Sequence, residues 1–177
     1  MNKFILAQIF GIIGSFAMIL SSWQKKRKRI LSFLLFDNLF YFLQYIILRA
    51  FSGAFVNLIG LVRLALFSKK GESKFFKTNF PLYIVIFLYL IVNIFTYDGI
   101  TSLFPAIAAI IYAFVLWQDK EKNIRKGTAI TLFLWILYGV FVKAYVSATS
   151  DGIQFISALI AIYKLDIKTR NENRINL

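Results

Sequence analysis

The sequence contains no cysteine and no histidine. Without cysteine there is no disulfide, no thiolate nucleophile and no cysteine-ligated metal. Without histidine the chain lacks the commonest metal ligand and the usual proton carrier near neutral pH. Phosphate-binding loops, dinucleotide fingerprints and zinc motifs are also missing from the sequence. We therefore expect no enzymatic activity, no cofactor and no metal.

Charge of negative sign is scarce as well, with eight Asp and Glu against 21 Lys and Arg. In a soluble protein such a balance would suggest nucleic acid. Here 59% of the residues are hydrophobic, whereas soluble domains are about half apolar. The cations fall between the apolar runs, which is typical of membrane topology rather than of nucleic-acid binding. We expect the lipid bilayer, and no nucleic acid, as the surroundings of the chain.

Seven apolar segments approach the 17 to 25 residues, roughly, that cross a bilayer. They cover residues 4–23, 30–48, 53–68, 80–97, 100–117, 128–142 and 146–164. The first resembles a signal peptide, but Trp23 and a basic run follow it instead of a small-residue cleavage site, which favours a transmembrane helix. The sequence thus predicts an all-α integral membrane protein with seven transmembrane helices.

The cations are distributed unequally between the two ends of these segments. Seventeen of the 21 Lys and Arg residues lie in alternate connections and the tail, and the other set of connections carries only Lys3, Arg49 and Lys143. Cytoplasmic loops are enriched in Lys and Arg. We therefore expect the N-terminus outside the cell and the C-terminus in the cytoplasm.

The chain repeats itself at an offset of 94 residues. A Trp-Gln pair followed at equal spacing by two lysines and an isoleucine begins at Trp23 and again at Trp117. The same offset, without a gap, pairs Tyr41 with Trp135. Two parallel repeats of three helices need one helix between them. We therefore divide the chain into a first repeat (1–70), a basic cytoplasmic loop and linker helix (71–97), a second repeat (98–166) and a cytoplasmic tail (167–177).

Four groups of residues carry a resemblance to a known family. They are Gly11 to Ser15, the basic loop after Gln24, Asn57 with Arg63 six residues later, and Trp117-Gln118 followed by Ile124-Arg125 and Trp135. With these residues the chain resembles the YgjV family of bacterial inner-membrane proteins. The arrangement of three, one and three helices is more distantly similar to the SWEET and PQ-loop transporter superfamily, although the Pro-Gln pair that names the superfamily is not present as such.

The resemblance to SWEET-type transporters implies a central pocket lined by an aromatic residue from the second helix and an Asn from the third helix of each repeat. The matching residues here are Tyr41 and Asn57 in one half and Trp135 and Asp151 in the other. Amide and carboxyl groups can hydrogen-bond a polar solute, and aromatic rings can stack on it. A competing interpretation is that Asn57 and Asp151 cap helix N-termini at the outer surface.

Charged residues within spans cost roughly 2.5–3.5 kcal/mol each and tend to be functional. Asp37 and Arg63 lie at compatible depths, so an ion pair between them is expected. It is either a structural salt bridge or part of a cytoplasmic gate or proton-coupling site. Pro105 is a further candidate for the gate, because it would kink the fifth span. Trp23 and Trp117 are interpreted as interfacial residues.

Together these features favour a transporter of a small polar metabolite such as a sugar, nucleoside or vitamin, working by alternating access between the two repeats. The alternative is a scaffold that does not transport, or a protein that binds lipid or a partner on the same fold. A polar cavity between the halves near Tyr41, Asn57, Trp135 and Asp151 would distinguish the two. Monomer and homo-oligomer both remain open.

Overall fold

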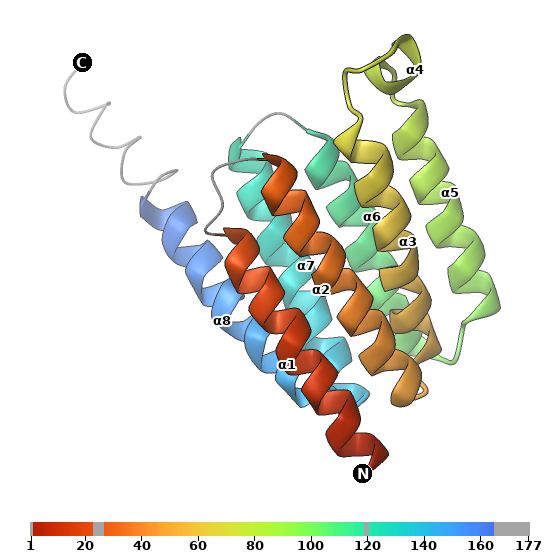
Figure 1. The fold of residues 1–177 in the computed structure, drawn as a ribbon, viewed down its shortest axis with the longest axis vertical. Helices are drawn as coiled ribbons and strands as arrows, with labels where there is room; N and C mark the ends of the chain where they lie inside the picture. The colour runs from red at the N-terminus through yellow and green to blue at the C-terminus, as the bar shows by residue number, and fades with distance from the viewer. Residues whose placement is uncertain (1, 23–26, 119–120, 165–177) are drawn as a thin grey trace.

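The computed structural model describes residues 2–22, 27–118 and 121–164, and within them the chain is helical, with no strand (Figure 1). The helices are α1 (Lys3–Ser22), α2 (Arg27–Ile47), α3 (Phe51–Ser68), α4 (Lys74–Lys77), α5 (Phe80–Phe95), a 3₁₀ turn η1 (Ile100–Ser102), α6 (Leu103–Trp117), α7 (Glu121–Phe141) and α8 (Tyr145–Ala161). The all-α prediction is confirmed for these residues. The tail over 167–177 and the Trp-Gln pair that starts at Trp23 lie outside them.

Four of these helical stretches are long and apolar enough to cross a membrane: α1, α3, α8 and the continuous stretch of η1 with α6. The apolar parts of α2, α5 and α7 are shorter, between 10 and 17 residues. Large apolar side chains such as Phe16, Phe87 and Phe95 are exposed, whereas polar side chains such as Gln44 and Asp151 are buried. This distribution is the reverse of a soluble fold and suits a bundle in lipid.

The helices form two consecutive groups that face each other. α2 packs against α1 and α3, and α7 packs in the same way against α6 and α8. The groups meet where α3 contacts α6 and where α1 contacts α8. Successive long helices run in opposite directions (Figure 1). We call the end at which α1 and α8 finish and α4 lies the basic end, because the lysines over 69–77 and the basic first turns of α2 and α7 lie there. The opposite end is the far end.

The offset of 94 that appears in the sequence also relates the backbone of the two groups. α7 begins and ends 94 residues after α2, and α8 begins 94 residues after α3. Between them, Arg49 and Lys143 both adopt a left-handed backbone conformation, with φ of 58° and 60°. Each helix pair is therefore joined by the same tight turn, in which Ala50 and Ala144 precede the next helix.

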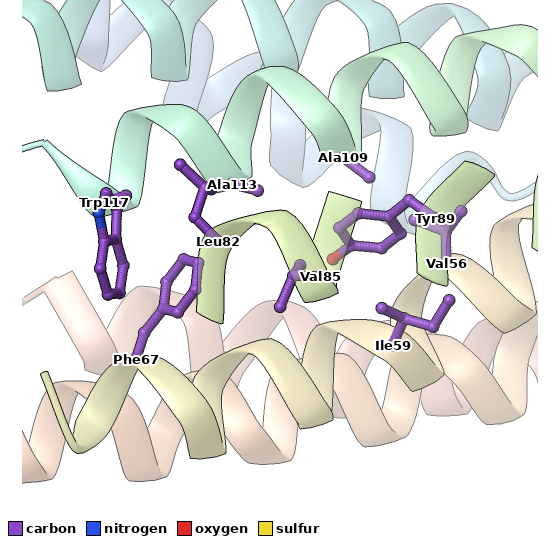
Figure 2. Packing of buried hydrophobic residues seen from close by; sticks show 9 residues of the cluster. All are labelled: Val56, Ile59, Phe67, Leu82, Val85, Tyr89, Ala109, Ala113 and Trp117. Atoms are coloured by element: carbon purple, nitrogen blue, oxygen red, sulfur yellow. The ribbon is translucent and has the colours of Figure 1, made fainter. Parts of the chain in front are cut away.

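Helix α5 covers one of the two contacts between the groups. It packs against both α3 and α6, and the three helices bury a common apolar cluster (Figure 2). Pro81 lies in the first turn of α5, where its missing N–H costs no hydrogen bond. The cluster holds α3 and α6 together on the outside of the bundle.

Trp117 belongs to this cluster, so its side chain faces other parts of the chain rather than the lipid headgroups. Its ring packs on Phe67 with centroids 4.9 Å apart, and its indole N–H donates to Asn79 Oδ1 at 2.8 Å. Lys70 donates to the Trp117 carbonyl at 2.7 Å and lies over its ring. The side chain therefore connects α6 to the chain before α5, because the segment over 69–79 folds back onto it.

Candidate functional site

A cavity of about 330 Å³ lies inside the bundle, and all seven long helices contribute side chains to it. Its volume is within the range of small-molecule sites. Its lining is Met18, Leu34, Asp37, Asn38, Tyr41, Tyr45, Val56, Asn57, Arg63, Tyr89, Ala109, Tyr112, Leu116, Thr128, Thr131, Leu132, Trp135, Asp151 and Gln154. Six of the seven residues that the sequence singles out, all except Pro105, are in this set.

The lining follows the internal repeat. Six pairs of lining residues are separated by 94 positions: Met18 and Tyr112, Leu34 and Thr128, Asp37 and Thr131, Asn38 and Leu132, Tyr41 and Trp135, and Asn57 and Asp151. The cavity therefore lies between the two groups of helices and takes equivalent positions from each. Applying the offset to every candidate would have found Thr131, which sequence reasoning missed.

Tyr41 and Trp135 face the cavity from α2 and α7. Tyr41 exchanges a hydrogen bond with Ser15 Oγ at 3.0 Å, and α1 can approach it because a Cβ at Gly14 would lie 3.0 Å from its ring. Trp135 stacks on Tyr45, with centroids 5.9 Å apart and planes at 26°. Together, Tyr41, Tyr45 and Trp135 form an aromatic wall that spans both groups.

Asn57 and Asp151 are each the seventh residue of their helix, α3 and α8, and both are buried. The interpretation of these residues as N-caps is wrong, because Ala50 and Ala144 occupy the cap positions. Asn57 Nδ2 donates to Gly53 O at 2.9 Å. Within the described residues, the Asp151 carboxylate has no hydrogen-bond or ion-pair partner. The two side chains are thus available to a solute in the cavity.

Asp37 and Arg63 line the same cavity but do not form the expected ion pair. Asp37 Oδ2 accepts a long hydrogen bond of 3.4 Å from Asn38, and its Oδ1 has no partner. The Arg63 guanidinium lies over the Tyr112 ring, 4.8 Å from the centroid, and its Nε has no partner. The difference arises because the cation turns toward the aromatic ring of α6, a neighbour that the sequence does not reveal.

Four buried polar atoms around this cavity have no hydrogen-bond partner among the described residues: Asp37 Oδ1, Arg63 Nε, Tyr89 OH and Gln154 Nε2. Leaving a buried polar group unsatisfied costs about 1–3 kcal/mol. They belong to α2, α3, α5 and α8, so both groups and the helix between them contribute unpartnered polar atoms. Donors and acceptors are both among them, which is what a small polar molecule would satisfy.

The far end of the cavity is closed by hydrogen bonds between the two groups. Tyr138 of α7 accepts from Gly53 N at 2.9 Å, exchanges a hydrogen bond with Ser52 Oγ at 3.0 Å and lies 3.3 Å from Ala50 O. The position 94 residues earlier is Gln44, which accepts from Ser147 Oγ of α8 at 2.9 Å. Tyr138 was not among the predicted residues, and its equivalence to Gln44 is the signal that could have found it.

A second cavity of about 540 Å³ lies at the far end, between the start of α3 and the ends of α5 and α7. Tyr138 lines it, while Tyr45 lines the central cavity, and their rings are 5.4 Å apart. This aromatic pair therefore stands between the two cavities. On the other side, Leu34 and Thr128 extend the central cavity toward the basic end.

Pro105 lies apart from both cavities. It is the third residue of α6, directly after η1, and is fully buried. In the first turn its missing N–H has no intrahelical acceptor to lose. Pro105 therefore lies near the start of α6, after η1, and not in the middle of the span, where it would kink the helix.

Comparison with known proteins identifies a family. The sequence model of a family described as bacterial inner membrane protein, Imp-YgjV, matches residues 5–169. No curated protein and no solved structure matches the chain.

Proposed function

Because the chain belongs to the Imp-YgjV family of bacterial inner membrane proteins, we propose that it is a multi-pass transporter of a small polar metabolite. In this proposal seven helices cross the membrane, in the SWEET-like order of three, one and three. The basic end faces the cytoplasm, as the positive-inside rule requires. The cavity between the two groups holds the solute and opens to each side in turn.

The observation that carries the proposal is the set of unpartnered polar atoms around the central cavity. A bundle that served only as a scaffold would be more stable with apolar side chains filling this space, because each orphaned group costs about 1–3 kcal/mol. A cost of this kind is retained where a function needs it. Water or a polar solute would remove it.

The far-end contacts support alternating access. Tyr138 and Gln44 join α7 to α3 and α2 to α8, so that a solute from the central cavity must pass the Tyr45–Tyr138 pair to leave in that direction. A few hydrogen bonds of this kind, each worth about 0.5–1.5 kcal/mol net, can break reversibly. In this scheme Tyr41, Asn57, Trp135 and Asp151 contact the solute, and Asp37 and Arg63 serve as gate or coupling residues.

The test is solute exchange in liposomes that contain the purified protein. Vesicles loaded with one member of a panel of sugars, nucleosides, vitamins and amino acids are supplied with the same radiolabelled compound outside. We expect the protein to accelerate exchange of at least one member. Leu132→Trp, which fills the cavity, should abolish exchange, whereas the matched Ile153→Trp on the exposed face of α8 should not.

The two variants must first elute as monodisperse protein with wild-type Tm, so that lost exchange is not lost folding. Exchange equal to that of protein-free vesicles for every member of the panel would contradict the proposal. That result would favour the scaffold or the lipid- or partner-binding protein. Exchange that survives Leu132→Trp would place the solute path elsewhere.

A further inference from the structure

The proposed function does not specify the class of solute. The ionisable residues of the central cavity indicate which class it binds. Resting on that function, we propose that the cavity binds a zwitterionic solute. Its acid group lies at Arg63, and its ammonium group lies at Asp151 beside the aromatic wall of Tyr41, Tyr45 and Trp135. A cavity that holds both a guanidinium and a carboxyl group without ion-pair partners can bind both charged groups of such a ligand.

The positive side of the cavity is Arg63. Its side chain is 5% exposed, and within the described part of the chain no carboxylate forms an ion pair with it. The planar guanidinium matches the geometry of a carboxylate or phosphate and binds it with two parallel hydrogen bonds. The ring of Tyr112 beneath the guanidinium holds its plane without using its N–H groups, and Nε is left without a partner.

The negative side is Asp151. It is 4% exposed, and among the described residues no donor reaches its carboxylate. A carboxylate beside aromatic ring faces is the arrangement that binds organic ammonium groups, because the rings attract the cation and the acid neutralises it. Tyr41, Tyr45 and Trp135 supply such faces in the same cavity. Asp37, with its free Oδ1, adds a second acceptor.

The two charges lie at different depths. Arg63 follows Asn57 by six residues in α3, which corresponds to about 9 Å along the helix axis. Asp151 occupies the position of Asn57 in the other group, and both residues line the cavity. The separation keeps the carboxylate and the guanidinium from neutralising each other and leaves room for a solute between them.

Solutes of other charge fit these groups less well. A neutral sugar would leave Arg63, Asp37 and Asp151 without a partner of opposite charge. An anion would satisfy Arg63 but would face two carboxylates, and a simple amine would satisfy the carboxylates but leave Arg63 without a partner. Burying a charge without a partner is costly, whereas a zwitterion pairs both sides at once.

The experiment measures binding to the full-length protein in nanodiscs by isothermal titration calorimetry, with chemically matched probes. The zwitterions are 4-aminobutyrate and 6-aminohexanoate. Each is compared with three analogues of the same chain length: the amine without the carboxylate, the carboxylate without the amine, and a neutral analogue with a hydroxyl in place of the amine and an amide in place of the carboxylate. Glucose is added as a further neutral solute. We expect at least one zwitterion to bind at least about tenfold more tightly than each of its matched analogues, as one additional charged hydrogen bond implies.

Two variants assign the ends of the solute. Arg63→Gln should make the zwitterion bind no better than its amine, and Asp151→Asn should make it bind no better than its carboxylate. Lys69→Gln and Glu72→Gln, which change exposed charges near α4, should leave both ratios unchanged. The result is the ratio of the affinities for zwitterion and analogue, both measured on the same variant. A general loss of affinity or stability lowers both affinities and does not change this ratio. Arg63→Lys, which keeps the charge without the planar fork, serves if Arg63→Gln fails to fold.

Equal binding of zwitterion and matched analogues, or tighter binding of glucose, would overturn the inference and leave the transport proposal standing. A preference for zwitterions that both variants preserve would also overturn it, because the charges would then act elsewhere. If none of the probes binds and the wider panel shows no exchange in liposomes, both the inference and the proposed function fall.

Discussion

The two groups of helices form the cavity wall from equivalent positions, but with different charges. In the cavity wall the first group has Asp37 where the second has Thr131, and Asn57 where the second has Asp151. The residue equivalent to Arg63 is Ser157, which is exposed and does not line the cavity. The bounds of α2 and α7, the starts of α3 and α8, the left-handed turns and the aromatic pair of Tyr41 and Trp135 are shared. The shared features build the frame, and the features that differ are the ions that a solute would contact.

Exchanging the polar residues at the equivalent positions tests whether the two groups are interchangeable. We expect the double variant Asn57→Asp with Asp151→Asn to reduce solute exchange about 100-fold, although the net charge of the cavity is unchanged. Asn57 donates to Gly53 O at 2.9 Å, and a carboxylate cannot do so. The roughly 100-fold reduction corresponds to the loss of one contact at position 57 and one at position 151, at about 1.5 kcal/mol each.

The measurement is the initial rate of exchange in liposomes at equal protein incorporation, with Glu72→Gln as the control for an exposed acid that lines neither cavity. Recovery of the wild-type rate in the double variant would show that only the total charge matters. The comparison between the groups would then carry no functional meaning.

Glycine at position 60 distinguishes the first group from the second, which has Gln154 at the equivalent position. A Cβ at Gly60 would collide with the side-chain oxygen of Asn38, which lines the cavity. We expect Gly60→Ala to lower the free energy of unfolding by about 1–3 kcal/mol, as overpacking does. Gly152→Ala is the control, because a Cβ there meets nothing within 4 Å, and it should be neutral or slightly stabilising.

Thermal unfolding in one detergent measures both glycine variants. A Tm for Gly60→Ala equal to that of Gly152→Ala would mean that Asn38 moves aside freely, and that the close approach of α2 to α3 is not required.

At the far end, three contacts converge on the Tyr138 hydroxyl, whereas the hydrogen bonds on the other side are spread over two residues, Gln44 with one and Gln8 with two. Tyr138→Phe removes the hydroxyl and leaves Gly53 N without its acceptor. We expect the far end to open about five- to tenfold more often, which corresponds to about 1 kcal/mol. Ser147→Ala, which removes the single hydrogen bond to Gln44, should have the smaller effect.

The chain has no cysteine, so a single Leu132→Cys reports access to the cavity without background labelling. A membrane-impermeant thiol reagent is applied from the far side, and the labelling rate is compared in the wild-type, Tyr138→Phe and Ser147→Ala backgrounds. Equal rates in all three would show that these hydrogen bonds do not control access.

The smallest expected effect concerns a feature that both groups share. Arg49 and Lys143 are non-glycine residues with positive φ, a conformation that costs roughly 1–2 kcal/mol. Replacing either residue by glycine removes this cost, but the greater freedom of glycine in the unfolded chain cancels part of the gain in stability. Arg49→Gly and Lys143→Gly should each raise the free energy of unfolding by about 0.5 kcal/mol, and by equal amounts. Opposite signs in thermal unfolding would show that the two turns are not equivalent in energy.

Much of the fold could be predicted from the sequence because its signals are local. Apolar runs separated by basic connections predicted the long helices, and the offset of 94 predicted which residues correspond between the groups. The resemblance to SWEET-type transporters implied Tyr41, Asn57, Trp135 and Asp151 as pocket residues, and the offset paired them between the groups. The structure brings all four to one cavity.

Neighbours across helices could not be predicted in this way. Whether Asn57 caps a helix or faces a cavity depends on how its helix is rotated against the others, and an apolar sequence in lipid constrains that rotation weakly. The ring of Tyr112 beneath Arg63, and the contact of Tyr138 with the start of α3, join segments far apart in the chain. The sequence by itself determined an all-α, internally repeated membrane chain with buried polar residues. Only the tertiary structure decided which of these residues meet, because side-chain contacts between helices depend on packing that no single segment encodes.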